Sequence, residues 1–343
     1  MTTPQGAALA PPRASLACRQ RGVPRRFFFR PHLSWGRPNL IKGRASWLQT
    51  SSATAVETSF HTVPSGLKLE VLSRKGAAVG GDKDSVKPPP MVFIHGSYHA
   101  AWCWSEHFFE YYASRGHDCY AVSMRGQGAS DVPQGGGVAG TLQDHAADIT
   151  HFIRSMEEGG SAPVLVGHSF GGLVAQLVMC QPSPPRLSAL ALLASVPPTG
   201  NGPMVGRFLR RSPLASLKIT YAFIAGAFKT NAPLCRECFF SLDLPERTLQ
   251  RHMGQIAGSC QVRLLDLKAL NDTLPIPAPP PGSPPVCVLG GCDDFVVDVE
   301  GLEETAAWGG TTALVLEGTA HDLMIDTRWE GAAGALAGWM VDY

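Results

Sequence analysis

The feature that most constrains this chain is a serine set among glycines between two apolar runs. Residues 167–172 read Gly-His-Ser-Phe-Gly-Gly, and they follow Ala162–Val166 and precede Leu173–Val178. This order predicts a strand, a sharp turn carrying Ser169, and a helix. Such a turn, called a nucleophile elbow, strains the serine backbone and exposes its hydroxyl at the end of the strand. Small flanking residues are needed because strand and helix pass close together. The pattern predicts that Ser169 is a nucleophile.

A nucleophilic serine needs a base, and His321 is the candidate. It follows the apolar run Thr312–Leu316 and precedes a helix expected at about Thr327–Met340. A loop just past the end of a strand is a suitable place for a catalytic base. The chain has ten other histidines. His321 is preferred to them because it follows both the serine and the candidate acid in the chain.

The acid that orients the base is predicted in the loop after the strand Val286–Leu289. The pattern G-x-x-D-x-x-V fits Asp294, between Gly291 and Val297. It fits Asp293 equally well, one residue earlier, so both remain candidates, with Asp294 preferred. Asp298 suits the N-cap of a helix that begins near Val299.

Two backbone N–H groups are expected to hold the oxyanion. One belongs to Phe170, the residue after the nucleophile. The other belongs to the loop after the strand Met91–His95, with Ser97 as its expected donor. His95 is interpreted as structural.

Strands alternate with helices over most of the chain, which predicts an α/β fold. Strands are expected at residues 91–95, 119–122, 162–166, 187–194 and 286–289, after a hairpin at 57–73. Helices are expected at about 103–114 and 141–156. Thr141 to Asp144 resembles a capping box that opens the second helix. Such alternation produces a mostly parallel sheet with helices on both faces. Ser97, Ser169, Asp294 and His321 would then meet beyond the carboxyl ends of the strands.

The pattern changes between residues 197 and 284. Several short apolar helices are expected there, followed by the Pro-rich stretch Pro275–Pro281, which suits a stiff non-helical return. The expected organisation is therefore a core at 56–196 and 285–343, with a helical cap inserted at 197–284. Aromatic side chains in the cap and the first loop are candidates for a substrate pocket, although they equally suit a local core. They are Tyr98, Trp102, Trp104, Phe223 and Phe228.

These motifs together resemble the α/β-hydrolase (AB hydrolase-1) superfamily, over about residues 57–343. The chain order Ser169, Asp294, His321 is that family's order. The resemblance implies an α/β-hydrolase fold with the cap above the nucleophile. Ser169 distinguishes the chain from epoxide hydrolases and dehalogenases, which carry an aspartate at this position.

A closer likeness lies in residues 93–104, Phe-Ile-His-Gly-Ser-Tyr-His-Ala-Ala-Trp-Cys-Trp. They are similar to the opening loop of the plant methylesterase and hydroxynitrile-lyase branch. The lyases have threonine at the position of Gly96 and lysine at that of Asp322, so lyase chemistry is disfavoured. Ser123 and Gln127 replace the Asp and His of the common Asp-x-Arg-Gly-His-Gly loop, which indicates a distinct subgroup.

Charge is distributed unevenly along the chain. Residues 1–56 hold nine Lys or Arg and no acid, which leaves residues 57–343 with a net charge of −8. The acidic part is a poor candidate for nucleic-acid binding. An Arg-, Ser- and Pro-rich leader without acids is typical of an organellar transit peptide at 1–55. Chloroplast is preferred to mitochondrion, and a disordered tail is the alternative. No run reaches the length of a membrane span.

Nine cysteines, an odd and scattered set, do not predict a disulfide framework. Cys235 and Cys238 form a single C-x-x-C. A zinc site would need a second pair, so two cysteines one helical turn apart are preferred to a redox pair. No metal or organic cofactor is expected.

The predicted function is hydrolysis of a carboxylic ester or thioester of a small, largely apolar molecule through an acyl-enzyme on Ser169. Two alternatives stay open. One is a ligand receptor on the same fold with little or no turnover; the other is a carbon–carbon lyase or acyltransferase that uses the same serine.

Overall fold

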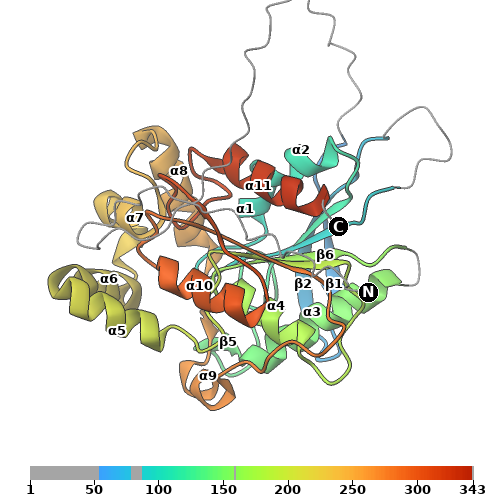
Figure 1. Ribbon diagram of the computed structural model, residues 1–343, viewed down its shortest axis with the longest axis horizontal. Helices are drawn as coiled ribbons and strands as arrows, with labels where there is room; N and C mark the ends of the chain where they lie inside the picture. Colours follow the sequence, from blue (N-terminus) through green and yellow to red (C-terminus); the bar gives the residue numbers. More distant parts are fainter. Residues whose placement is uncertain (1–53, 79–86, 158–159, 342–343) are drawn as a thin grey trace, which may run out of the picture. The chain divides into compact units, whose positions relative to one another are not determined.

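Eight strands form one central sheet in the computed structural model, which describes residues 54–78, 87–157 and 160–341 (Figure 1). The strand order is β1-β2-β4-β3-β6-β7-β9-β10. The strands are β1 (Glu57–Thr62), β2 (Lys68–Arg74), β3 (Met91–Ile94), β4 (Cys119–Val122), β6 (Val164–His168), β7 (Ala189–Leu193), β9 (Val286–Gly291) and β10 (Leu314–Leu316). From β4 to β10 all neighbours are parallel, and β1 and β2 add an antiparallel edge.

Strand β6 lies in the middle of the sheet because its residues are apolar on both faces. Val164 pairs with Met91 of β3 on one side and with Ala189 of β7 on the other. All five residues of β6 are buried. A strand buried on both faces reads as a continuous apolar run, which is the pattern from which it was predicted.

Helices cover both faces of the sheet, and side chains alternate between the two helical layers. Phe93 and Val166 pack toward one layer, and Val92 and Leu165 toward the other. The first layer holds α1 (Trp102–Ser105), α2 (Phe108–Ala113) and α11 (Trp329–Val341); the second holds α3 (Leu142–Glu157), α4 (Phe170–Met179) and α10 (Val299–Trp308). The α/β fold with a mostly parallel sheet is confirmed.

Short helices fill the interval between β7 and β9. They are α5 (Gly202–Arg211), α6 (Pro213–Ala225), η1 (Ala227–Lys229), α7 (Ala232–Phe239), α8 (Glu246–Ser259) and α9 (Leu267–Thr273). The strand β8 (Arg263–Leu265) interrupts them and pairs with β5 (Val138–Gly140), which ties this insertion to the core. Residues 274–280 contain no helix. We call 197–284 the cap.

Two helix starts follow the sequence closely. Thr141 and Asp144 form the predicted capping box, since Asp144 Oδ2 accepts from Thr141 N at 2.9 Å and Thr141 Oγ1 accepts from Asp144 N at 3.1 Å. Asp298 caps α10 by accepting from Gly301 N at 3.0 Å. The single aromatic helix expected at 103–114 is instead two helices, separated at His107, whose ring stacks on Trp329 at 4.4 Å.

The predicted leader at 1–55 lies almost wholly outside the described residues, so it stays a prediction. Among the residues that the structure describes, no helix combines the length and apolar character needed to cross a bilayer.

Candidate active site

Ser169 occupies the turn between β6 and α4 in a strained backbone conformation. Its φ of 53° and ψ of −123° are rarely adopted by a residue with a side chain. A Cβ on Gly167 would lie 2.6 Å from the carbonyl oxygen of Gly171, and one on Gly171 would collide with the backbone of His95. The neighbouring glycines therefore allow the close strand–helix approach that the elbow requires.

The acid of the pair with His321 is Asp294 rather than Asp293. Nδ1 of His321 lies 2.8 Å from Oδ2 of Asp294, and both side chains are buried. The other carboxylate oxygen of Asp294 accepts from Val296 N at 2.6 Å and Val297 N at 2.9 Å. Asp293 is exposed. Because Asp294 is held by two backbone donors, it can fix both the tautomer and the ring orientation of His321.

Ser169 and His321 line the same cavity, whose volume is about 660 Å³. Ser97 and Phe170 also line it. Neither the N–H of Ser97 nor that of Phe170 donates to another group among the described residues. A Cβ on Gly96 would lie 2.8 Å from Cβ of Ser169, so the Ser97 loop runs directly beside Ser169. Two free donors near the serine are what an oxyanion hole needs.

The cap closes the cavity with apolar side chains. Tyr98 and Phe223 are part of the wall, as predicted from the sequence. Tyr98 has a left-handed φ of 67°, and its hydroxyl donates to the carbonyl of Phe223 at 3.0 Å. This bond ties the loop of Ser97 to helix α6. Sequence reasoning did not identify four further lining residues, which are Met204 and Val205 of α5 and Phe295 and Val296 of the loop after Asp294.

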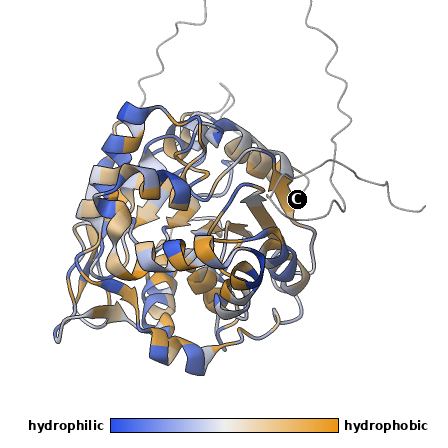
Figure 2. Cartoon of the chain, turned by 90° about the vertical axis from the view of Figure 1, so that its left-hand side faces the viewer, coloured by the Kyte–Doolittle hydropathy of each residue, from blue (hydrophilic) through white to orange (hydrophobic). Residues whose placement is uncertain are grey.

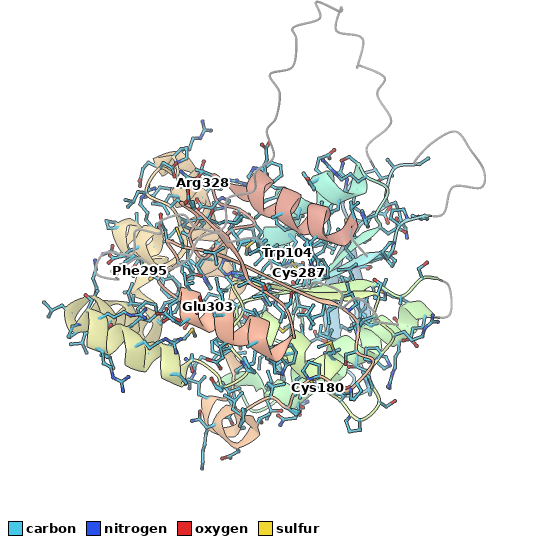
Figure 3. The ribbon with its side chains drawn as sticks, viewed as in Figure 1. Trp104, Cys180, Cys287, Phe295, Glu303 and Arg328 are labelled. Atoms are coloured by element: carbon cyan, nitrogen blue, oxygen red, sulfur yellow. The ribbon has the colours of Figure 1, made fainter. Side chains whose placement is uncertain are left out.

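Three predicted pocket residues lie elsewhere. Trp104 is fully buried in the core, 4.9 Å from the ring of Phe93 (Figure 3). Trp102 donates to Ser259 Oγ at 2.7 Å and stacks on His99. Phe228 is buried inside the cap against Phe239. All three pack behind the residues that line the cavity. This is the local-core alternative that the sequence left open.

A second group of polar residues lies behind the His321–Asp294 pair. Nε2 of His99 lies 2.8 Å from Oδ2 of Asp322, and neither side chain is accessible. Burial disfavours both charges, but their mutual attraction prevails, so the pKa of His99 is raised and that of Asp322 is lowered. The pair is therefore ionic. Sequence reasoning noted Asp322 only as a departure from the lyases.

His168 lies between that ion pair and the backbone of His321, with its Nε2 3.9 Å from Oδ1 of Asp322. Its Nε2–H donates to the carbonyl of His321 at 3.0 Å. Burial, and then repulsion by His321, lower the pKa of His168 well below its usual value, so this ring is neutral. The position of His321 thus depends on contacts at both its ring and its backbone.

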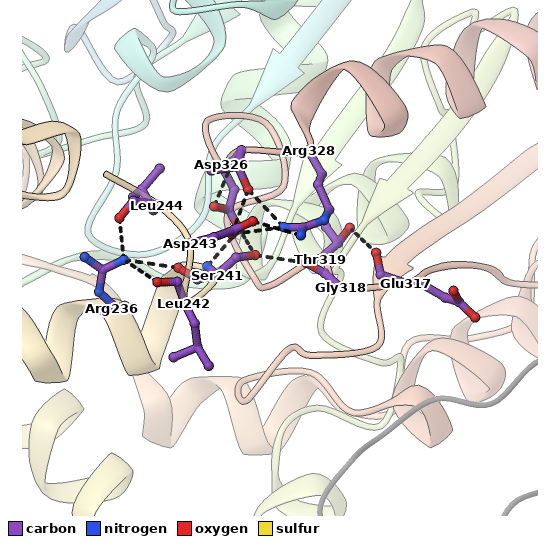
Figure 4. Close-up of polar contacts among 11 residues, drawn as sticks. Arg236, Ser241, Leu242, Asp243, Leu244, Glu317, Gly318, Thr319, Asp326 and Arg328 are labelled. Atoms are coloured by element: carbon purple, nitrogen blue, oxygen red, sulfur yellow. Dashed lines mark hydrogen bonds and ion pairs between the residues drawn. The ribbon is translucent and has the colours of Figure 1, made fainter. Parts of the chain in front are cut away.

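The loop of His321 is also fastened to the cap (Figure 4). The hydroxyl of Ser241 lies 2.5 Å from Oδ2 of Asp326 and 3.1 Å from the carbonyl oxygen of Gly318, so either can accept its single proton. The N–H of Ser241 donates to Asp326 at 2.9 Å. Outside this buried contact, Arg328 forms an exposed ion pair with Asp243 at 2.9 Å. The cap therefore contacts the loop that carries His321 directly.

Among the described residues, one group has donor atoms close enough to hold a metal: His168, His321 and Asp322, within 4.8 Å of one another. Each already has a partner in the network above. Cys235 and Cys238 are both buried in α7, and burial raises the pKa of each thiol to about 12. Such thiols are poor nucleophiles, which supports their interpretation as packing residues.

Comparison with known proteins agrees with the fold. The model of the "Alpha/beta hydrolase family" matches residues 91–335. The chain belongs to this family. The family membership covers β3 to α11 and therefore every residue of the site described above.

Curated relatives of this chain include plant esterases. It is 32% identical over 123 residues to "Probable esterase PIR7A" of Oryza sativa. The aligned stretch covers 35% of this chain and 45% of the relative. It is 32% identical over 119 residues to "Methylesterase 1" of Arabidopsis thaliana, or 33% and 41% of the two chains. The matches thus span less than half of the relatives' length. They agree with the local likeness to the plant methylesterase branch.

Solved structures agree on the fold alone. A bromoperoxidase from Bacillus anthracis matches with a TM-score of 0.60 at 16% identity, covering 83% of this chain and 99% of that chain. The epoxide hydrolase VrEH1 from Vigna radiata matches with a TM-score of 0.57 at 19% identity, covering 84% and 98%. Because these names describe different reactions, the fold does not decide the chemistry.

Proposed function

We propose that this hydrolase cleaves a carboxylic ester or thioester through an acyl-enzyme on Ser169. The observation that carries the proposal is the buried 2.8 Å contact between His321 and Asp294, in a cavity that Ser169 also lines. The names of the plant relatives, esterase and methylesterase, support ester cleavage as the reaction.

The geometry supports a two-step acyl transfer. His321 takes the hydroxyl proton as Ser169 attacks the carbonyl carbon, and Asp294 stabilises the imidazolium that forms. The N–H groups of Ser97 and Phe170 hold the oxyanion. The tetrahedral intermediate collapses, and His321 passes the proton to the departing alcohol or thiol. Water, deprotonated by His321, then attacks the acyl group and releases the acid and free Ser169.

The substrate is a small, largely apolar molecule. The cap side of the cavity is built mainly from hydrocarbon and aromatic side chains, which favour an apolar group next to the ester. Ile219 and Phe239 extend this wall beyond Tyr98 and Phe223. A volume of about 660 Å³ accommodates a ligand of the size usual for small-molecule sites.

Intact mass after treatment with a fluorophosphonate tests the proposal, with Ser169→Ala as the control. We expect one adduct on the wild type and none on the control, followed by turnover on a panel of esters and thioesters of varied chain length. Folded wild-type protein that takes no adduct would contradict the proposal and favour a receptor with little turnover. An adduct with products other than acid and alcohol or thiol would favour a lyase or an acyltransferase.

A further inference from the structure

The outer face of the cap exposes an unusual amount of hydrocarbon. On α6, Leu214, Leu217, Tyr221 and Ile224 are 83%, 60%, 63% and 82% exposed. Their spacing of three, four and three residues places them on one side of the helix. On α5, Leu209 is 40% exposed. A surface helix normally turns its apolar side chains toward the core. A ridge of apolar side chains that faces outward is instead typical of a surface that binds a partner.

This ridge is continuous with the mouth of the cavity. Four residues are both exposed and part of the cavity lining: Val205, Ile224, Leu267 and Phe295. We call these four residues and the ridge of α5 and α6 the apolar rim. It contains most of the exposed large hydrophobic side chains of the described residues. Figure 2 looks onto this side of the molecule, and Figure 3 labels Phe295 on it.

The charge of the same segment is opposite to that of the rest of the folded part. Residues 197–236 contain six Arg or Lys and no Asp or Glu, whereas residues 57–343 as a whole carry −8. Four of the six form ion pairs: Arg207 and Arg211 with Asp298, Lys218 with Glu237, and Arg236 with Glu246. Four further cations around the rim have no carboxylate within ion-pair distance among the described residues. They are Arg210, Lys229, Arg263 and Lys268.

We propose that the apolar rim docks the hydrolase on an anionic lipid bilayer, with the cavity mouth facing the membrane. An interfacial helix binds by burying apolar side chains at the headgroup boundary while cations near it attract anionic lipids. A second copy of the chain is a poorer occupant, because a symmetric contact would bring the cations of one rim against those of the other. The substrate then passes from the bilayer directly into the cavity. The docking does not depend on the chemistry proposed for Ser169.

Hydrogen–deuterium exchange of the full chain tests the proposal, because it localises the contact. Residues 1–56 are themselves basic, so binding to vesicles alone would not identify the rim. The lipids are vesicles of phosphatidylcholine, with or without an equal part of phosphatidylglycerol. The variant is Leu214→Ser, Leu217→Ser and Tyr221→Ser together. The matched control is Phe60→Ser with Leu242→Ser, whose side chains are 54% and 85% exposed away from the rim.

We expect exchange of residues 202–225 to slow on anionic vesicles and to slow much less on phosphatidylcholine. The variant should lose this slowing, and its affinity for anionic vesicles should fall by about tenfold or more. The control should behave as the wild type. Exchange in 202–225 that does not change on bound vesicles would overturn the proposal. If exchange slows with rising protein concentration in the absence of lipid, the proposal is overturned in favour of a dimer. If exchange slows equally on both kinds of vesicle, the preference for anionic lipid is overturned.

Discussion

Asp322 lies 2.8 Å from His99 in a site closed to solvent, and it directly follows His321 in the chain. The side chain of Asp322 therefore contacts the buried His99 ring, whereas the side chain of its neighbour His321 contacts Asp294. Both carboxylates face imidazole rings, but only Asp294 contacts the ring that lines the cavity. The distinction between an orienting acid and a structural ion pair is therefore made by geometry.

The two neighbouring aspartates after β9 should differ sharply in their effect on catalysis. We expect Asp294→Asn to lower kcat by about 10⁴-fold, because an amide cannot hold the tautomer of His321 or stabilise its charge. Asp293→Asn should leave kcat nearly unchanged, since this side chain is exposed and does not contact His321. Steady-state kinetics on any ester that the wild type turns over provides the measurement, and equal losses in both variants would contradict the assignment.

The ion pair of His99 and Asp322 should make stability depend on pH. The contribution of His99 is complete below its unfolded pKa of about 6.5 and is lost as pH rises through its raised folded pKa. That of Asp322 is complete above about 3.9 and is lost as pH falls through its lowered folded pKa. The pair therefore stabilises the fold most between about pH 4 and 6.5.

Asp322→Asn tests this dependence. It leaves a buried imidazolium without a counter-charge, so we expect a loss of about 3 kcal/mol at about pH 6 and a smaller loss at about pH 9. Urea unfolding of both proteins at the two pH values measures the difference. A loss that is the same at both values would show that the pair is not ionic.

Two glycines should respond to alanine in opposite directions. Gly167→Ala places a Cβ 2.6 Å from a backbone oxygen of the elbow, and we expect it to cost about 2 kcal/mol and to disturb Ser169. Gly254→Ala lies at an exposed position within α8 with no atom within 4 Å, and we expect a gain of about 1 kcal/mol. Thermal unfolding compares them. Similar shifts would indicate that strand and helix do not pass as closely as described.

The contact between the cap and the base loop should influence catalysis as well as stability. Ser241→Ala removes the hydroxyl that lies within hydrogen-bond distance of Asp326 and of the carbonyl of Gly318, so we expect a loss of about 1 kcal/mol and a lower kcat. Asp243→Asn weakens only exposed contacts, those of Asp243 with Arg328 and with the hydroxyl of Thr327, which should cost less than about 1 kcal/mol and leave kcat unchanged. Unfolding and kinetics on both variants separate the two contacts, and a normal kcat for Ser241→Ala would show that the base loop does not need the cap.

Local chemistry was sufficient to predict much of this protein. The turn of Ser169, the capping box of Thr141 and Asp144, and the N-cap Asp298 each depend on a few adjacent residues, so the sequence itself specifies them. The parallel sheet followed from alternating apolar runs, because strands buried on both faces must be continuous in hydrophobicity. The candidate positions of Ser97, Ser169 and His321 followed in turn, since the carboxyl ends of parallel strands meet at one edge.

Other features depended on contacts between distant segments, which no local pattern encodes. Asp293 and Asp294 fit the same spacing, and only the packing of the loop against β10 determines that Asp294 turns inward to His321. Trp104 and Tyr98 are aromatic residues only six positions apart, but Trp104 faces the core and Tyr98 the cavity. His99 and Asp322 are 223 residues apart, and the charge of each is retained only because folding places the other beside it. By itself the sequence determined which groups are available, and the tertiary structure decided which of them meet, because burial and distance set the strength of every polar contact.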